Sequence, residues 1–245
     1  MSKAASVLFA VVAYAIFFAT FLYLIAFVGD LPLVPLTVER GPSAPLGSSV
    51  AIDVGLIALF GVQHSVMARQ GFKQAWTRIV PKQAERSVYV LAASAALMIL
   101  FLGWHPLPDT MWRTSGTLSA VLWALFGFGW LVVLLSTFLI NHFELFGLEQ
   151  AWFHARGREA APPQFRQPLF YKYVRHPLYT GFFLAFWATP HMSYGHLLLA
   201  IGMSVYMLIA ISYEERDLVG LFGPDYEAYR QRVGMLTPRF RRRPS

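Results

Sequence analysis

The stretch GTLSAVLWALFGFGWLVVLLSTFL, residues 116–139, carries no charged side chain. An α-helix needs about 20 consecutive apolar residues to cross the hydrocarbon core of a bilayer, so this stretch predicts a transmembrane helix. Similar runs occupy 5–28, 49–67 and 87–104. The last apolar segment is interrupted by Pro190 and Gly195, which favour a turn. It predicts a hairpin of two shorter helices, 178–190 and 196–213. We therefore expect an all-α, polytopic transmembrane bundle of about five to six spans with a C-terminal helical hairpin.

The composition agrees with a membrane protein. Hydrophobic residues make up 56% of the 245 residues and charged residues 13%, about half the charged content of soluble domains. The chain has no cysteine, which excludes disulfides, thiolate metal sites and cysteine nucleophiles. Any thiol in its chemistry must therefore belong to a substrate, and we expect no metal.

The basic residues are distributed unevenly between the two sides of such a bundle. Eighteen of the twenty Lys and Arg residues lie before residue 5, within 68–86 and 140–177, or after residue 213; the exceptions are Arg40 and Arg113. With six crossings these segments share one side, which the positive-inside rule makes cytoplasmic, together with both termini. We expect a bacterial inner-membrane protein whose basic excess faces anionic lipid headgroups. Dispersed basic loops do not favour nucleic-acid binding.

Polar side chains collect at the predicted cytoplasmic ends of the helices. They come from three separate parts of the chain: Gln63 and His64; then Asn141, His142 and Glu144; then Tyr171, Tyr173, Arg175, His176, Glu214 and Glu215. A lone polar residue at a helix end is more often an interfacial anchor than a site. Ionisable residues at membrane depth are costly, however, and they commonly mark function. Their convergence at one level predicts a functional site at this face.

The segment YKYVRHPLYTG, residues 171–181, has features of a ligand-binding helix entrance. Pro177 suits the first turn of a helix, and Gly181 allows another backbone or a ligand to approach closely. Arg175 and His176 would then precede a helix N-terminus, whose free N–H groups favour an anion. With the carboxylates of Glu214-Glu215 at the same face, this arrangement permits binding of a zwitterionic ligand.

Two motifs resemble a known superfamily. RHPLYTG at 175–181 followed by YEER at 213–216 resembles the signature of the isoprenylcysteine carboxyl methyltransferase and phospholipid methyltransferase superfamily of integral-membrane enzymes. The resemblance covers roughly residues 140–235 and implies binding of S-adenosylmethionine at the cytosolic face. FGVQHSVMAR at 60–69, ERSVYVL at 85–91 and NHFELFGLEQ at 141–150 are similar to the bacterial methanethiol S-methyltransferases. This implies conversion of methanethiol to dimethyl sulfide; a branch linked to denitrification shares the fold.

The resemblance implies a role for each half of the chain. Residues 1–140 would form a four-helix transmembrane half with the acceptor-side residues. Residues 141–245 would form the cytosolic connector, hairpin and tail that hold the cofactor. For the acceptor we expect His64 as general base, with Asn141 and His142 orienting the thiol or the base and Glu144 as a weaker alternative. For S-adenosylmethionine we expect Tyr171, Tyr173, Arg175, His176, Tyr179, Gly181, Glu214 and Glu215.

Two other functions stay open from the sequence. The same fold could methylate a larger lipidic thiol, amine or carboxyl group, which requires a wide cleft open to lipid. A non-catalytic protein could instead bind haem or quinone, with His64 and His142 on different helices as the axial ligands. The sequence leaves the oligomeric state undetermined.

Overall fold

The protein is described here by a computed structural model that covers residues 1–159 and 164–239. It is an all-α polytopic bundle, as predicted. Within the described residues, five helices are long and apolar enough to cross a membrane: α1 (Lys3–Val28), α2 (Leu46–Ala68), α4 (Lys82–Gly103), α5 (Gly116–Ile140) and α9 (Tyr194–Phe222). Large apolar side chains such as Leu8, Val62 and Leu102 are exposed on their outer faces. Such surfaces fit contact with lipid tails rather than water.

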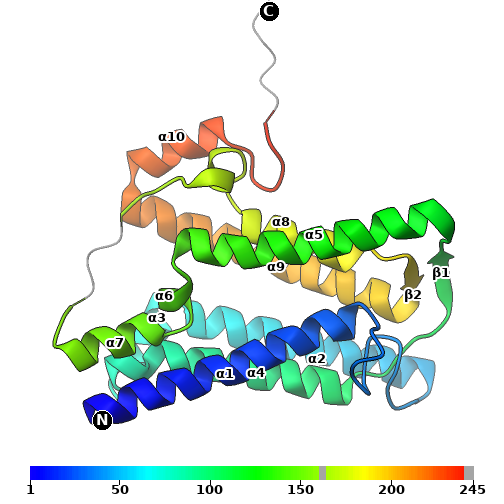
Figure 1. Cartoon of the computed structure of the whole chain (residues 1–245), viewed down its shortest axis with the longest axis horizontal. Coiled ribbons are helices and arrows are strands. Elements are labelled where there is room, and N and C mark those ends of the chain that lie inside the picture. The colour runs from blue at the N-terminus through cyan, green and yellow to red at the C-terminus, as the bar shows by residue number, and fades with distance from the viewer. Residues whose placement is uncertain (160–163, 240–245) are drawn as a thin grey trace, which may run out of the picture.

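The helices form two layers (Figure 1). One layer contains α1, α2 and α4, and the other contains α5, α8 (Pro177–Trp187) and α9; α2 and α9 touch across the layers. The helices α5 and α8 lie close together, since a Cβ atom at Gly181 would lie 2.7 Å from the carbonyl oxygen of Gly129. The close approach predicted at Gly181 is therefore between two helix backbones. In the fold, α5 packs against the hairpin helix α8, although the sequence was expected to divide at residue 140, with α5 in the N-terminal half.

The hairpin differs from the predicted one at both of its helices. Its first helix, α8, has only 11 residues, which span about 16 Å at 1.5 Å per residue, roughly half of a bilayer core. Its second helix, α9, continues to Phe222 instead of ending at residue 213. The extension has a packing reason, because Leu218, Val219 and Phe222 lie against Tyr226 and Tyr229 of α10 (Pro224–Arg232).

The two ends of the bundle have different architectures. At one end lie the short helices α3 (Gln70–Trp76), α6 (His142–Leu145), α7 (Leu148–Arg156) and α10, with the 3₁₀ turn Leu169–Lys172 and the N-terminus (Figure 1). At the other end, β1 (Thr110–Arg113) pairs antiparallel with β2 (His191–Ser193); the sequence predicted only a loop and a turn there. The segments rich in Lys and Arg thus gather at the first end, as predicted.

Candidate functional site

The entrance of α8 is held against the segment that follows α10. Pro177 occupies the first turn of α8 and His176 is its N-cap residue. The backbone N–H groups of Arg175 and His176 donate to the carbonyls of Gly234 (2.8 Å) and Met235 (3.1 Å), and the Thr180 hydroxyl donates to Leu236 (2.9 Å). These bonds fix the predicted RHP segment at the charged end of the bundle.

Glu215 lies at the centre of a buried ion cluster. Its Oε1 accepts from Arg175 Nε at 2.8 Å and lies 3.1 Å from His176 Nε2, and its Oε2 lies 3.1 Å from Arg230 Nε. The Arg175 and Glu215 side chains are each only 9% exposed, and buried charges require such pairing. The structure thus joins the predicted Arg175, His176 and Glu215. It adds Arg230, which the sequence analysis counted only among the tail's basic residues.

Glu214, next in the chain, has a different environment. Its side chain is 45% exposed, and its Oε2 is 3.9 Å from His176 Nδ1, beyond hydrogen-bonding distance. The Tyr179 side chain lies beside it. Glu214 is therefore an accessible carboxylate beside a cluster in which Glu215 is already neutralised.

Tyr171 and Tyr173 lie on the connector that leads to this cluster. The hydroxyl of Tyr229 donates to the Tyr171 carbonyl at 2.6 Å, and burial raises the pKa of Tyr229 to about 12, so the donated proton stays in place at neutral pH. Burial also raises the pKa of the Tyr171 hydroxyl. Tyr173 is 65% exposed. The two tyrosines therefore lie at the edge of the site, Tyr171 packed and Tyr173 open.

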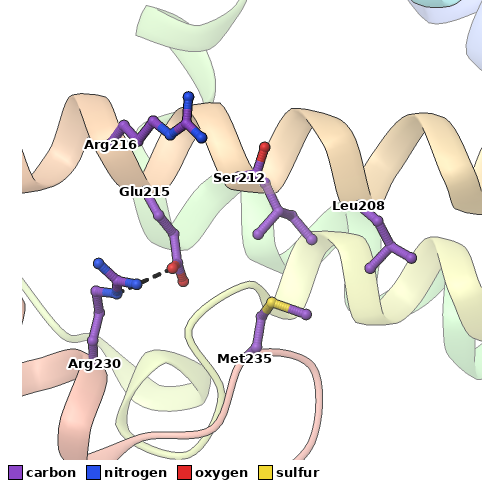
Figure 2. Close-up of a pocket in the computed structure, with 7 residues that line it drawn as sticks. Leu208, Ser212, Glu215, Arg216, Arg230 and Met235 are labelled. Carbon is purple, nitrogen blue, oxygen red and sulfur yellow. Dashed lines mark ion pairs between the residues drawn. The ribbon is translucent and has the colours of Figure 1, made fainter.

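A hollow of ≈ 420 Å³ borders the ion cluster (Figure 2). Its lining comes from one face of α9, from α10 and from the segment after it: Leu208, Ile211, Ser212, Glu215, Arg216, Arg230 and Met235. Small-molecule sites typically enclose about 300–1,000 Å³ and combine apolar walls with a few polar groups. The hollow has this size and composition. It borders Glu215 but not His64, so it adjoins only the predicted cofactor half.

His64 lies among aromatic rings from three helices. Its Nε2 is 2.7 Å from the hydroxyl of Tyr89 on α4. Its ring stacks on Phe60 at 5.3 Å between centroids, and Tyr206 of α9 meets it edge-on at 6.1 Å. Its Nδ1 is sealed from solvent and has no hydrogen-bond partner in residues 1–159 and 164–239. Buried polar atoms are normally paired, so an unpaired one calls for an explanation.

His142 is fully paired. The Thr137 hydroxyl donates to the Leu134 carbonyl (2.7 Å), so the Nδ1–H of His142 donates to Thr137 Oγ1 (2.8 Å) and Nε2 accepts from the Tyr14 hydroxyl (2.8 Å). The ring also stacks on Phe138 at 4.1 Å. Burial lowers the pKa of His142. A neutral ring with both nitrogens occupied offers no position for a metal or a haem iron.

Asn141 fixes the junction between α5 and α6. Its Oδ1 accepts from the backbone N–H of Glu144, and its Nδ2 donates to the carboxylates of Glu149 (2.5 Å) and Glu144 (3.1 Å). The first of these bonds satisfies one of the orphan backbone donors at the start of α6, and the other two tie the Asn141 side chain to the two carboxylates. The contacts of Asn141 and Glu144 thus lie within this junction, apart from His64.

Tyrosines connect His64 with the cofactor half. Tyr179 lies near Glu214, Tyr206 and Tyr89. Tyr206 and Tyr89 in turn pack around His64. Tyr89 and Tyr206 were not predicted as site residues from the sequence, since aromatic residues within apolar helices usually pack in the core or face lipid. One available signal was the spacing of Arg86 and Tyr89, which places both on one helix face; the Arg86 guanidinium lies 4.9 Å from the Tyr89 ring centroid.

The chain is similar to several characterised families of proteins. Residues 54–241 match the family described as NnrU protein. The chain is 51% identical to methanethiol S-methyltransferase 1 of Bradyrhizobium diazoefficiens over 232 residues, 94% of this chain and 81% of that protein. It is 48% identical to the methanethiol S-methyltransferase of Mycobacterium tuberculosis, covering 97% of this chain and 98% of that one. A Nurim homolog of Drosophila pseudoobscura pseudoobscura is 30% identical over 69% of this chain and 70% of its own. No solved structure matches the chain.

Proposed function

Since this chain belongs to the NnrU protein family and to the methanethiol S-methyltransferases, we propose that it methylates the sulfur of methanethiol and forms dimethyl sulfide. The observation that carries this proposal is the likeness to enzymes of that name over nearly the full length of this chain. The multi-pass helical fold agrees with it. The orientation we propose is the one that the basic segments favour, with the charged end and both termini on the cytoplasmic side of a bacterial inner membrane.

A methyltransferase requires a methyl donor, and for this chain we propose S-adenosylmethionine. When bound, it supplies a methyl group activated by a sulfonium. The residues present fit its chemistry. Arg216 at the edge of the hollow suits a carboxylate, the half-exposed Glu214 suits an ammonium, and Leu208 and Met235 offer apolar surface. Tyrosine rings nearby can attract a sulfonium through cation–π interaction.

The eight predicted cofactor residues divide by what their side chains touch. Glu214 and Tyr179 are the two that we propose as cofactor contacts, because neither is held within the ion cluster of Arg175, His176 and Glu215. Arg175, His176 and Glu215 neutralise one another and hold the entrance of α8 in position. Tyr171 and Tyr173 border the site, and Gly181 lets α8 lie close against α5. We therefore propose that Arg175 supports the entrance of α8 and does not bind a ligand carboxylate, because its guanidinium is already paired with Glu215.

For the acceptor we propose His64 as the general base. The thiolate is the reactive form of a thiol, and thiols with a pKa near 8.5 or higher are mostly protonated at neutral pH. In the tautomer with its proton on Nε2, His64 donates to Tyr89 and presents Nδ1 as an acceptor. The thiol proton then moves to Nδ1 as the thiol sulfur forms the new bond to the methyl carbon. The bond between that carbon and the donor sulfonium would break at the same time, and its electron pair would stay on the donor sulfur, which leaves as a neutral thioether. Tyr89 orients the ring and stabilises the imidazolium.

Asn141 and His142 keep a supporting place in this proposal. Their contacts fix the junction of α5 with α6 and seat Tyr14 of α1 against it. An orienting role for them stays a prediction. The crowding of Phe60, Tyr89 and Tyr206 around His64 favours a small thiol over a large lipidic acceptor.

The proposed function is tested with membranes that contain the chain. They would be given methanethiol and S-adenosylmethionine whose methyl group is deuterated, and the headspace analysed by gas chromatography with mass detection. We expect dimethyl sulfide that carries one deuterated methyl group. Product without the label would exclude S-adenosylmethionine as the donor, and no product above membranes lacking the chain would exclude methanethiol as the acceptor.

A further inference from the structure

Tyr206 lies at the boundary between the proposed base and the proposed cofactor site. It is on α9, eight residues before Glu214, which places it about 12 Å along the helix at 1.5 Å per residue. Its ring lies across from α2, where a Cβ atom at Gly61 would come within 3.1 Å of Tyr206 Cδ2. The absence of a side chain at Gly61 thus lets the Tyr206 ring lie directly against the α2 backbone.

The imidazole of His64, which carries the free Nδ1, is packed against three rings that differ in burial. Phe60 and Tyr89 are each 7% exposed, and one stacks on His64 while the other bonds to its Nε2. Tyr206 is only partly buried, and it meets both Phe60 (5.6 Å) and His64 (6.1 Å) edge-on. Among these rings, Tyr206 is therefore the one that can move with least loss of packing.

We propose that the Tyr206 ring sets the size of the thiol that this enzyme accepts. An acceptor whose S–H reaches His64 Nδ1 must fit within the ring enclosure, and any chain on its sulfur extends toward the least buried wall. A single methyl group is the smallest possible substituent. A longer alkyl chain must displace Tyr206, whose ring is backed by α2 at Gly61. This inference rests on the proposed function and adds what determines the enzyme's selectivity among thiols.

The test compares two acceptors in four variants. Methanethiol and 1-propanethiol would be supplied separately with S-adenosylmethionine to purified full-length protein in detergent, and kcat/KM measured for each by gas chromatography of the methylated thioether. One methylene in an apolar pocket changes kcat/KM by about 10–200-fold. We expect Tyr206→Ala to raise the ratio of propanethiol to methanethiol by about ten-fold or more. Tyr206→Leu, which preserves more of the packing, shifts it in the same direction.

Two matched controls separate the ring from other effects. Tyr206→Phe keeps the ring and removes only the hydroxyl, so its ratio should equal that of the unmodified protein. Tyr194→Ala removes a tyrosine from the same helix at the opposite end, where the side chain is 49% exposed, and it should also leave the ratio unchanged.

The outcomes distinguish this inference from the proposed function. If the unmodified protein makes dimethyl sulfide but the ratio is unchanged in Tyr206→Ala and Tyr206→Leu, only the selectivity inference is overturned. A ratio raised equally in Tyr206→Phe or Tyr194→Ala also overturns it, since the ring would not be the cause. If the unmodified protein makes no thioether from either thiol, the proposed function fails and this inference with it.

Discussion

His64 and His142 are two imidazoles near the same end of the bundle with opposite surroundings. Both nitrogens of His142 are bonded, to Thr137 and Tyr14, and the ring joins α5 and α6 to α1. His64 is bonded only through Nε2, to Tyr89, and its Nδ1 has no partner among the described residues. The sequence alone gives both histidines the same appearance, since each is a polar residue at the end of an apolar run.

This difference distinguishes polar groups whose bonds hold the fold together from polar groups that are free to meet a ligand or a proton. Leaving a buried polar atom unbonded costs about 1–3 kcal/mol. Of the nine such side-chain atoms in the described residues, His64 Nδ1 is the one imidazole nitrogen. The same distinction holds between the neighbouring acids of α9, because Glu215 is saturated by two arginines and a histidine whereas Glu214 is half exposed. We therefore expect the saturated member of each pair to govern stability and the open member to govern function.

The largest effect is expected from Glu215→Ala. Removing this carboxylate leaves the Arg175 guanidinium buried without its partner, and breaking a buried pair in this way costs about 3–5 kcal/mol. The free energy of unfolding, followed in detergent by denaturant titration, should fall by that amount. Asp217→Ala, an exposed acid on the same helix, is the matched control and should change it little. An equal fall in the free energy of unfolding in the two variants would contradict the special role in stability given to Glu215.

Glu214→Gln should show the complementary behaviour. It keeps the size of an open side chain but removes the charge proposed to meet the ammonium of S-adenosylmethionine. We expect the dissociation constant, measured by calorimetry, to rise about ten-fold, equivalent to about 1.4 kcal/mol, with the unfolding free energy nearly unchanged. Unaltered affinity would take Glu214 out of the cofactor site.

A smaller, pH-dependent effect is expected from His142. Burial lowers its pKa in the folded protein, whereas in the unfolded chain the pKa returns to about 6.5. Below that pH the unfolded state binds more protons, so stability falls as the pH drops from about 6.5 toward the folded pKa, and it is unaffected above. The loss is about 1.4 kcal/mol for each unit between the two pKa values. His142→Gln should flatten this slope, and an identical slope in the variant would assign it to another group.

Much of the fold could be predicted because membrane spans leave a strong signal in the sequence. Apolar runs located four of the five long helices to within five residues at either end, and the start of α9 to within two, and the distribution of Lys and Arg located the charged end. The end of α9 was wrong, because its last two turns are stabilised by contact with α10 rather than by local hydropathy. The β1–β2 pairing was missed because such short strands form only when distant segments meet.

The site could be predicted in part for the same reason. Charged residues such as Arg175, His176 and Glu215 are conspicuous in an apolar chain, and the structure joins them as expected. Arg230 was hidden within a generally basic tail, and Tyr89 and Tyr206 among many aromatics. Which nitrogen of which histidine is free depends on three-dimensional contacts, so the sequence could not show that His64 Nδ1 is unpaired and that both nitrogens of His142 are bonded.

The most direct test of this account is the turnover of His64→Ala compared with His142→Ala. Both variants would be assayed with methanethiol and S-adenosylmethionine at equal amounts of folded protein, and dimethyl sulfide measured in the headspace. Loss of a general base typically lowers turnover by about 10²–10⁴-fold. We predict a decrease of that size for His64→Ala, and for His142→Ala a loss of stability with turnover per folded molecule largely kept. Near-normal turnover in His64→Ala, or the larger loss of turnover in His142→Ala, would contradict the account.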